Sequence, residues 1–216
     1  MDKKKKYDSI LFDLDGTLTD SGPGIMRCVR TVLDHYGIPV DHPDDLRVFV
    51  GPPLVKTFFE WGVPKDEGDN ALALYRKDYN VTGLFENSVY EGVEDMLRRL
   101  KQEGFRLFVA TSKPENTART VLEHFGLDGY FEYIGGAGMD ETRLTKEEVI
   151  EYILSRKNIG RAVMAGDTEY DVTGAKKFGI ETIGVSWGYG QKEAMIKAGA
   201  VYMIDSPEEI YSLIYE

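Results

Sequence analysis

Asp13 and Asp15, two carboxylates one residue apart, are the first residues in the chain whose types and spacing suggest chemistry. They follow the short apolar run 9–12 and precede Gly16, so they stand where a buried β-strand would end. Alternate side chains of a strand share a face, which would let both carboxylates converge on one site. Carboxylates this close repel each other, so the pair predicts a metal ion, a proton donor or both. A tight Asp-Gly turn that closes a hairpin is the alternative interpretation.

Further polar side chains follow later strands of the sequence. Thr111 and Ser112 come directly after a strand expected over 106–110, and Asp167 and Asp171 follow a compact apolar run. Parallel strands joined by right-handed helical crossovers end at one edge of a sheet. We therefore expect these hydroxyls and carboxylates to lie near the first pair of aspartates.

Lys146 stands at the expected start of a helix. Residues 145–148 have the T-x-x-E form of a capping box, which places Lys146 in the first helical turn. A cation is unfavourable beside the positive end of a helix dipole, so this lysine needs either an anionic partner or solvent. Solvent is the usual environment of a lysine.

The types of these side chains favour a hard metal ion and a phosphate group. Carboxylate oxygens without a histidine or cysteine cluster suit Mg²⁺, and a lysine with a threonine suits phosphate oxygens. The three histidines show no ligand spacing. The single cysteine, Cys28, excludes an internal disulfide.

The elements that must position these residues alternate between strand and helix at both ends of the chain. Between them the pattern is helical: a helix begins at Pro23 and ends at Gly37, and further helical stretches cover 44–49, 54–61 and 71–79. We expect an α/β fold with a Rossmann-like parallel sheet formed by 1–19 and 88–216, and an inserted all-helical domain formed by 20–87.

Composition limits the partners of the chain. The net charge of −11 argues against a general binder of nucleic acid or of anionic membranes, since both require a basic surface. No segment approaches the ~20 apolar residues that a membrane span needs. Lys3 to Lys6 do not start a signal peptide, because the apolar run that follows them is too short. We expect a cytoplasmic protein whose lysine-rich N-terminus is solvated and frayed.

Four stretches together resemble the haloacid dehalogenase superfamily of aspartate-nucleophile phosphohydrolases. They occur in the family's order and span most of the chain: residues 13–18 (Asp-Leu-Asp-Gly-Thr-Leu), residues 111–114 (Thr-Ser-Lys-Pro), Lys146, and Gly166-Asp167 with Asp171. The helical insert resembles the mobile cap of the phosphoglycolate-phosphatase-like branch. Within that branch, the region around Arg47 and the stretch 133–150 are similar to a subgroup known as phosphoglycolate phosphatases or 5′-nucleotidases.

The resemblance implies roles for the carboxylates. Asp13 would attack phosphorus and form an aspartyl-phosphate, and Asp15 would act first as general acid on the leaving alcohol and then as general base on water. Mg²⁺ would be held by Asp13, by the backbone carbonyl of Asp15 and by Asp167, with Asp171 in support.

It also implies residues that bind the substrate. Thr111, Ser112 and Lys146 would hold the phosphate oxygens, with Lys113 as a helper. In the cap, Arg47 is a candidate for a second anionic group of the substrate, or only a surface arginine. Gly51 and Pro52, which begin a Gly-Pro-Pro loop, would either shape the cap over the phosphate or merely separate two helices.

The expected function is therefore a Mg²⁺-dependent phosphatase that acts on a small soluble phosphomonoester resembling phosphoglycolate or a nucleoside monophosphate. Its partner would be this small molecule, with no nucleic acid and no membrane, and the protein would be a monomer or a homodimer. A phosphomutase acting on a sugar phosphate and a non-enzymatic phospho-acceptor module are the alternatives.

Overall fold

The computed structural model describes residues 4–138 and 142–216. The chain divides into two compact units, one formed by Met1–Leu18 with Val89–Glu216 and the other by Thr19–Ser88. We call the first the core unit and the second the helical unit.

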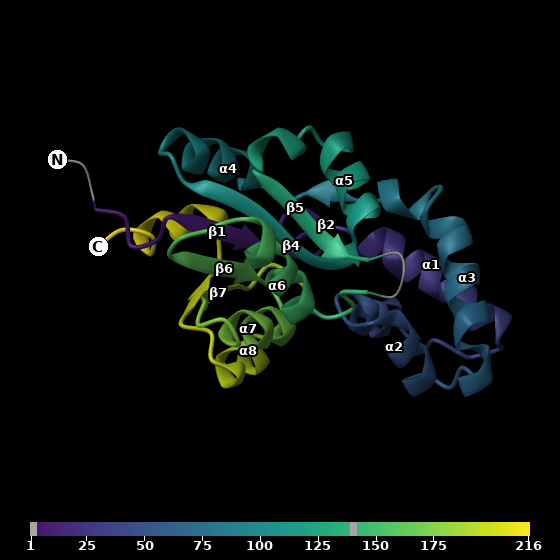
Figure 1. The fold of residues 1–216 in the computed structure, drawn as a ribbon. Helices are drawn as coiled ribbons and strands as arrows, with labels where there is room; N and C mark the ends of the chain where they lie inside the picture. The colour runs from purple at the N-terminus through teal and green to yellow at the C-terminus, as the bar shows by residue number, and fades with distance from the viewer. Residues whose placement is uncertain (1–3, 139–141) are drawn as a thin grey trace. The chain divides into compact units, whose positions relative to one another are not determined.

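The core unit is built on a parallel sheet. Within the described residues it has six strands in the order β5-β4-β1-β6-β7-β8 (Figure 1). Their bounds are β1 Ser9–Phe12, β4 Arg106–Pro114, β5 Tyr133–Ala137, β6 Ala162–Gly166, β7 Glu181–Val185 and β8 Tyr202–Ile204. Parallel pairing on both sides of β1 excludes the Asp-Gly hairpin, and the predicted α/β fold with a Rossmann-like sheet is confirmed.

The register of β1 fixes where the chemistry can lie. Phe12 pairs with Val109 of β4 on one side and with Ala165 of β6 on the other. The residues that follow these three strands therefore leave the sheet at the same edge. One difference from the sequence prediction is that β4 continues to Pro114, with an irregularity in its pairing to β5 after Ala110. Thr111 and Ser112 thus lie within this irregular end of β4.

Helices cover both faces of the sheet. Figure 1 shows α4 on the opposite side of the sheet from α6 and α7. The α-helices of the core unit are α4 Val93–Gln102, α5 Glu115–His124, α6 Lys146–Arg156, α7 Glu169–Lys176 and α8 Lys192–Ala198. Short 3₁₀ helices cover Asp128–Tyr130 and Pro207–Ser212. Helix α6 buries Val149, Ile150 and Ile153 against Phe108 and Met164 of the sheet. This packing fixes the position of the first turn of α6, and with it Lys146.

The helical unit contains α1 Gly22–His35, α2 Leu54–Glu60 and α3 Gly68–Tyr79. The stretch predicted as helical at 44–49 is a 3₁₀ helix, Pro43–Phe49, and two shorter 3₁₀ helices cover Lys65–Glu67 and Gly83–Phe85. The strands β2 (Thr19–Asp20) and β3 (Ser88–Val89) pair with each other. The core of the unit includes Phe49, whose ring lies 5.3 Å from those of Phe58 and Trp61.

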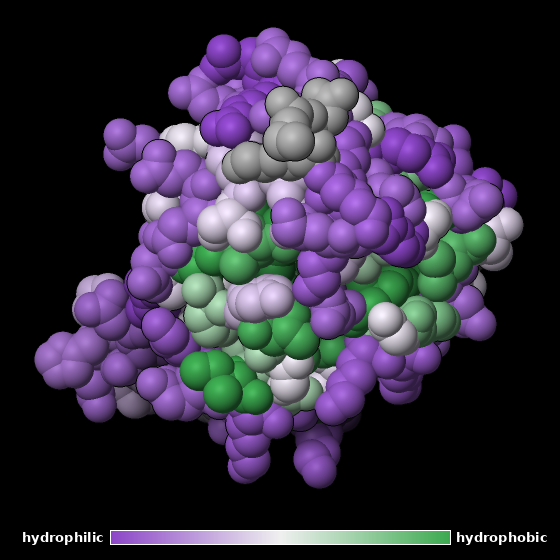
Figure 2. All heavy atoms as spheres, turned by 90° about the vertical axis from the view of Figure 1, so that its left-hand side faces the viewer, coloured by the Kyte–Doolittle hydropathy of each residue, from purple (hydrophilic) through white to green (hydrophobic). Residues whose placement is uncertain are grey.

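The two ends of the described chain pair with each other. Lys5 forms an antiparallel bridge with Tyr215, and the Lys6 N–H donates to the Ile214 carbonyl over 2.9 Å. The expectation of a frayed terminus is therefore wrong for residues 4–6, while Lys3 lies outside the described residues. Figure 2 views the molecule from the side of the chain ends and shows a band of hydrophobic side chains bordered by hydrophilic ones.

Among the described residues, no helix combines the length and the apolar character that crossing a membrane would require.

Candidate active site

Asp13 leaves the end of β1 and is held in one orientation. Its backbone N–H donates to the Ala165 carbonyl over 2.9 Å, which continues the sheet by one residue. Its carboxylate Oδ1 accepts a hydrogen bond from the Leu14 N–H (2.7 Å) and contacts the Lys146 ammonium at 2.7 Å. The side chain of Leu14 is fully buried. The local sequence thus anchors the strand end on Leu14 and turns the Asp13 carboxylate toward Lys146.

Lys146 is a buried cation between three acceptors. Its Nζ lies 2.7 Å from Asp13 Oδ1 and 2.8 Å from Asp171 Oδ1, and it donates to the Ala110 carbonyl over 2.9 Å. Burial alone would lower the pKa of this ammonium, but attraction to the two carboxylates outweighs burial and raises it. Between solvent and an anionic partner, the structure therefore selects the anionic partner, and Lys146 is 5% exposed.

The predicted capping box sets the position of Lys146. The Thr145 side chain accepts from the Glu148 N–H, and the Glu148 carboxylate accepts from the Thr145 N–H over 2.9 Å. Across from the lysine, α7 has Gly174, where a Cβ atom would lie 2.9 Å from Lys146 Cγ. The absence of a side chain there lets the lysine pass into the site.

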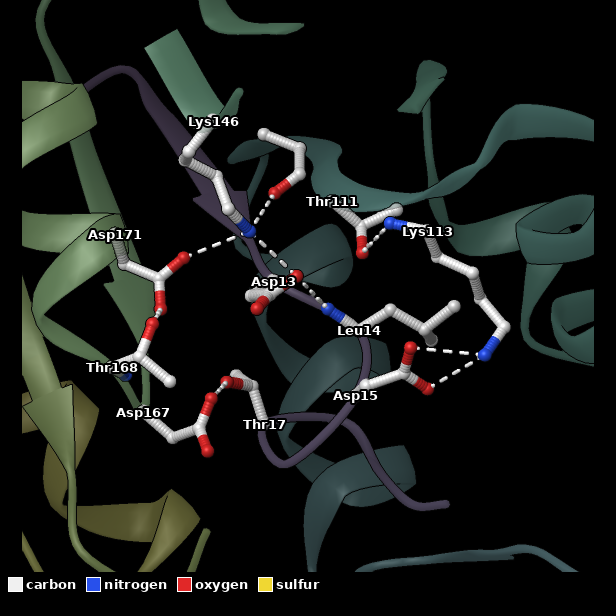
Figure 3. A network of polar contacts seen from close by, with 11 residues as sticks. Asp13, Leu14, Asp15, Thr17, Thr111, Lys113, Lys146, Asp167, Thr168 and Asp171 are labelled. Atoms are coloured by element: carbon white, nitrogen blue, oxygen red, sulfur yellow. Dashed lines mark hydrogen bonds and ion pairs between the residues drawn. The ribbon is translucent and has the colours of Figure 1, made fainter. Parts of the chain in front are cut away.

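Asp13, Asp167 and Asp171 form a buried carboxylate cluster (Figure 3). Each of the three residues has one carboxylate oxygen that lies within 4.8 Å of the corresponding oxygens of the other two. Burial raises the pKa of Asp13 to about 6 and that of Asp167 to about 8, and repulsion from neighbouring carboxylates adds to both shifts. Among the described residues, Lys146 is the cation in contact with this cluster, through Asp13 and Asp171, so the cluster keeps a net negative charge that a divalent ion would neutralise.

The donor set fits Mg²⁺. All of the oxygens in the cluster come from carboxylates, which are the protein ligands this ion prefers, and its remaining positions are ordinarily filled by water and substrate phosphate. Asp13, Asp167 and Asp171 would hold the ion.

Asp171 serves two purposes at once. Its Oδ2 accepts from the N–H of Thr168 (3.0 Å) and from its hydroxyl (2.9 Å), which caps the start of α7. Its Oδ1 faces Lys146. Asp171 therefore both caps α7 and belongs to the carboxylate cluster.

Asp15 does not join the cluster with its carboxylate. Both of its oxygens contact the Lys113 ammonium, at 3.0 and 2.9 Å, and the Lys113 side chain is only 4% exposed (Figure 3). The two aspartates of the first motif thus have different cationic partners. A metal contact through the Asp15 backbone carbonyl stays a prediction.

Thr111 and Ser112 lie in the irregular end of β4. Thr111 is buried, and its Oγ1 accepts from the Lys113 N–H over 3.2 Å, while Ser112 is half-buried. Figure 3 places Thr111 on the side of Asp13 away from Asp171. Their proposed contact with phosphate stays a prediction.

The cap candidates lie in the helical unit. Arg47 is exposed on the 3₁₀ helix Pro43–Phe49, Gly51 is exposed with a left-handed φ of 106°, and Pro52 is half-buried. These three residues are near one another in the chain. Their role toward the carboxylate cluster stays a prediction.

Sequence reasoning missed the segment that follows β7. The Tyr189 N–H donates to Asp167 Oδ2 over 2.8 Å, and the Thr17 hydroxyl donates to Asp167 Oδ1 over 3.4 Å. The signal was present: residues 186–190 follow a strand as the other site residues do, and they contain two glycines.

The core unit thus has a parallel sheet with a buried carboxylate after β1 and a lysine-bridged carboxylate cluster beside it. The model of the haloacid dehalogenase-like hydrolase family matches residues 10–185, and the chain belongs to this family. The match confirms the resemblance drawn from the four motifs.

Relatives and solved structures cover most of the chain. It is 40% identical over 199 residues to a 5′-nucleotidase of Pseudomonas aeruginosa, covering 90% of this chain and 89% of the relative. It is 43% identical over 190 residues to the tyrosine-protein kinase PtkA of Mycobacterium tuberculosis, covering 87% of this chain but only 65% of that relative. The crystal structure of a predicted phosphatase from Clostridium acetobutylicum has a TM-score of 0.91 at 43% identity, covering 96% of this chain and 97% of that one.

Proposed function

We propose that this protein is a Mg²⁺-dependent phosphatase that hydrolyses a small phosphomonoester through an aspartyl-phosphate (acyl phosphate) intermediate on Asp13. The observation that carries the proposal is the Asp13 carboxylate, oriented through Oδ1 by Lys146 and Leu14 and placed within a cluster of further carboxylates. A carboxylate held in one orientation can attack the phosphorus of each bound substrate from the same defined direction.

The chemistry then follows from the chain's own residues. An Asp13 oxygen attacks phosphorus while the bond from phosphorus to the leaving oxygen breaks, and Asp15 gives that oxygen a proton. In the second half, Asp15 removes a proton from water, water oxygen attacks phosphorus, and the bond to Asp13 breaks to release phosphate. Lys146 and Thr111 stabilise the phosphoryl oxygens. A bound divalent ion would neutralise carboxylate and phosphate charge together.

Lys113 holds the Asp15 carboxylate in place before the reaction. Both Asp15 oxygens contact the same ammonium, so the acid–base group has one defined position. We include Lys113 in the catalytic machinery as the residue that orients Asp15. A substrate phosphate that approached would compete for the same ammonium, which would free Asp15 to receive and give protons.

The substrate we propose is a compound resembling phosphoglycolate or a nucleoside monophosphate. The 5′-nucleotidase relative supports the nucleotide half of this range. We assign substrate selection to the helical domain of residues 20–87 acting as a cap, with Arg47, Gly51 and Pro52 as the candidate contacts. The oligomeric state, a monomer or a homodimer, stays a prediction, and so does the cytoplasmic location.

Phosphate release from a substrate panel tests the proposal. The panel contains phosphoglycolate, nucleoside 5′-monophosphates and pyrophosphate, each with Mg²⁺ and with a chelator. Wild type is compared with Asp13→Asn and with Asp128→Asn, an exposed carboxylate that serves as the control. Metal-dependent turnover that Asp13→Asn alone abolishes supports the nucleophile. Equal release by all three proteins, or release from no compound, would overturn the proposal.

Transfer to a tyrosine hydroxyl is a second candidate, favoured by the 43% identity to a tyrosine-protein kinase. The phosphorus of an aspartyl-phosphate on Asp13 can be attacked by a phenol oxygen as well as by water. Incubation with radiolabelled ATP and a tyrosine-containing peptide separates the two functions. Label in the peptide that depends on Asp13 supports transfer, and label in free phosphate alone supports hydrolysis.

A further inference from the structure

The loop that follows Asp13, residues 14–18, is called the nucleophile loop. The segment of residues 186–190, Ser-Trp-Gly-Tyr-Gly, connects this loop with the carboxylate cluster. The Trp187 indole N–H donates to the Thr17 carbonyl over 3.0 Å. Two residues later, the Tyr189 N–H donates to Asp167 Oδ2 over 2.8 Å. One short segment therefore contacts both the loop that follows Asp13 and a predicted metal ligand.

The glycines of this segment allow it to pack directly on Asp167. A Cβ atom on Gly188 would lie 2.4 Å from Asp167 Oδ2, and one on Gly190 would lie 1.9 Å from the Asp167 carbonyl. Gly16 on the nucleophile loop is as close, since its Cβ would lie 2.2 Å from Asp167 Oδ2. Asp167 is thus enclosed between two backbone segments with no space for another side chain.

The two segments each give Asp167 one hydrogen bond. Thr17 donates to Oδ1 at 3.4 Å (Figure 3), and Tyr189 donates to Oδ2 at 2.8 Å. The angle of the carboxylate therefore depends on the spacing between the segments. The bond from Trp187 to the Thr17 carbonyl is a direct connection between them, and it ends on the residue whose hydroxyl contacts Asp167.

We propose that Trp187 is a positioning residue: its indole N–H fixes the distance between the 186–190 segment and the nucleophile loop, and so orients Asp167 for the divalent ion. This inference rests on the proposed metal site. Trp187 acts through Thr17 and Asp167 and has no chemical role of its own. Loss of its indole N–H should lower the free energy of Mg²⁺ binding more than it lowers the free energy of unfolding.

The experiment measures Mg²⁺ affinity by calorimetry and unfolding temperature in chelator, on the full chain. The chain has two tryptophans, so in a Trp61→Phe background Trp187 stands alone. Global replacement by benzothienylalanine, which has the shape of tryptophan but lacks the N–H, then removes one hydrogen bond at one place. Trp187→Phe is the genetic counterpart. Ser186→Ala is the matched control, because Ser186 bonds to Asp205 and not to the cluster.

Loss of the indole N–H should weaken Mg²⁺ binding about three- to tenfold, the range of one hydrogen bond. Turnover should recover at saturating Mg²⁺, whereas Ser186→Ala should leave the affinity unchanged. Gly188→Ala, which pushes on Asp167 directly, should weaken binding more than about tenfold.

Three results would overturn the inference. If both Trp187 replacements bind Mg²⁺ as tightly as the Trp61→Phe protein, the residue does not orient Asp167. A lower unfolding temperature with unchanged affinity would give Trp187 a purely structural role. If wild type itself binds no Mg²⁺, the metal site of the proposed function fails and this inference fails with it. If wild type binds Mg²⁺ and the Trp187 replacements bind it equally well, only this inference fails.

Discussion

Replacing Lys146 by methionine should be the most destabilising single change in the candidate site. The substitution keeps most of the side-chain volume but removes the ammonium that contacts Asp13 at 2.7 Å and Asp171 at 2.8 Å. Both carboxylates are buried, so they would keep the cost of desolvation without their partner. Removing one member of a buried ion pair costs about 3–5 kcal/mol. For a chain of this size, that corresponds to a fall in unfolding temperature of about 6–20 °C.

Thermal unfolding at pH 8 in the presence of a chelator measures this loss. Lys177→Met is the matched control, since Lys177 pairs with Glu147 from the neighbouring helix but its side chain is 58% exposed. An exposed pair contributes about 0–1 kcal/mol, so the control should lower the unfolding temperature by less than about 4 °C.

Proton uptake offers a further check on the same variant. Without the ammonium, Asp13 should bind a proton more tightly, so the cost of Lys146→Met should shrink at pH 5. Equal falls in unfolding temperature for Lys146→Met and Lys177→Met at pH 8 would refute the reasoning. Such a result would mean that the ammonium contributes no more to stability inside the site than on the surface.

Three further predictions concern the same site. Because the pKa of Asp167 is raised from 3.8 to about 8, the folded chain binds this proton more tightly than the unfolded chain. Stability in chelator should therefore fall as pH rises from about 4 to about 8, and Mg²⁺ should reverse the fall; an unfolding temperature that is flat across this window contradicts the shift. Gly16→Ala should abolish calorimetric Mg²⁺ binding, since Gly16 has φ 83° and its Cβ would lie 2.2 Å from Asp167, whereas Gly37→Ala, with φ 66° and open space, should only cost stability. Equal Mg²⁺ affinity in the two variants would argue against the close contact. Lys113→Met should lower kcat about ten- to a hundredfold without changing Mg²⁺ affinity, because Lys113 contacts Asp15 and not the cluster; an unchanged kcat would remove Lys113 from the mechanism.

Much of the fold could be predicted because its signals are local. The run 9–12 is β1, the T-x-x-E box caps α6 through Thr145, and α1 begins beside Pro23 and ends before Gly37. The two errors had different causes. Residues 43–49 form a 3₁₀ helix, and periodicity does not separate this from an α-helix over so short a stretch. Lys5 pairs with Tyr215, more than 200 residues away in the chain, for which the sequence holds no nearby signal.

The candidate site divides in the same way. The sequence placed the Asp13 carboxylate at a strand end and Lys146 in a first helical turn, and these positions depend only on neighbouring residues. It did not reveal that Lys113, 98 residues away, would bind Asp15. Nor did it reveal that Trp187, 170 residues from Thr17, would bind its carbonyl.

The sequence by itself determined which chemical groups stand at the strand ends, because strand and helix boundaries follow from periodicity, caps and turn residues within a few positions. The tertiary structure decided which cation neutralises which carboxylate. That choice depends on β1 lying between β4 and β6, which brings Lys113 and Asp167 to opposite sides of the first motif. Strand order is set by packing over the whole core unit, so no local stretch of the chain encodes these pairings.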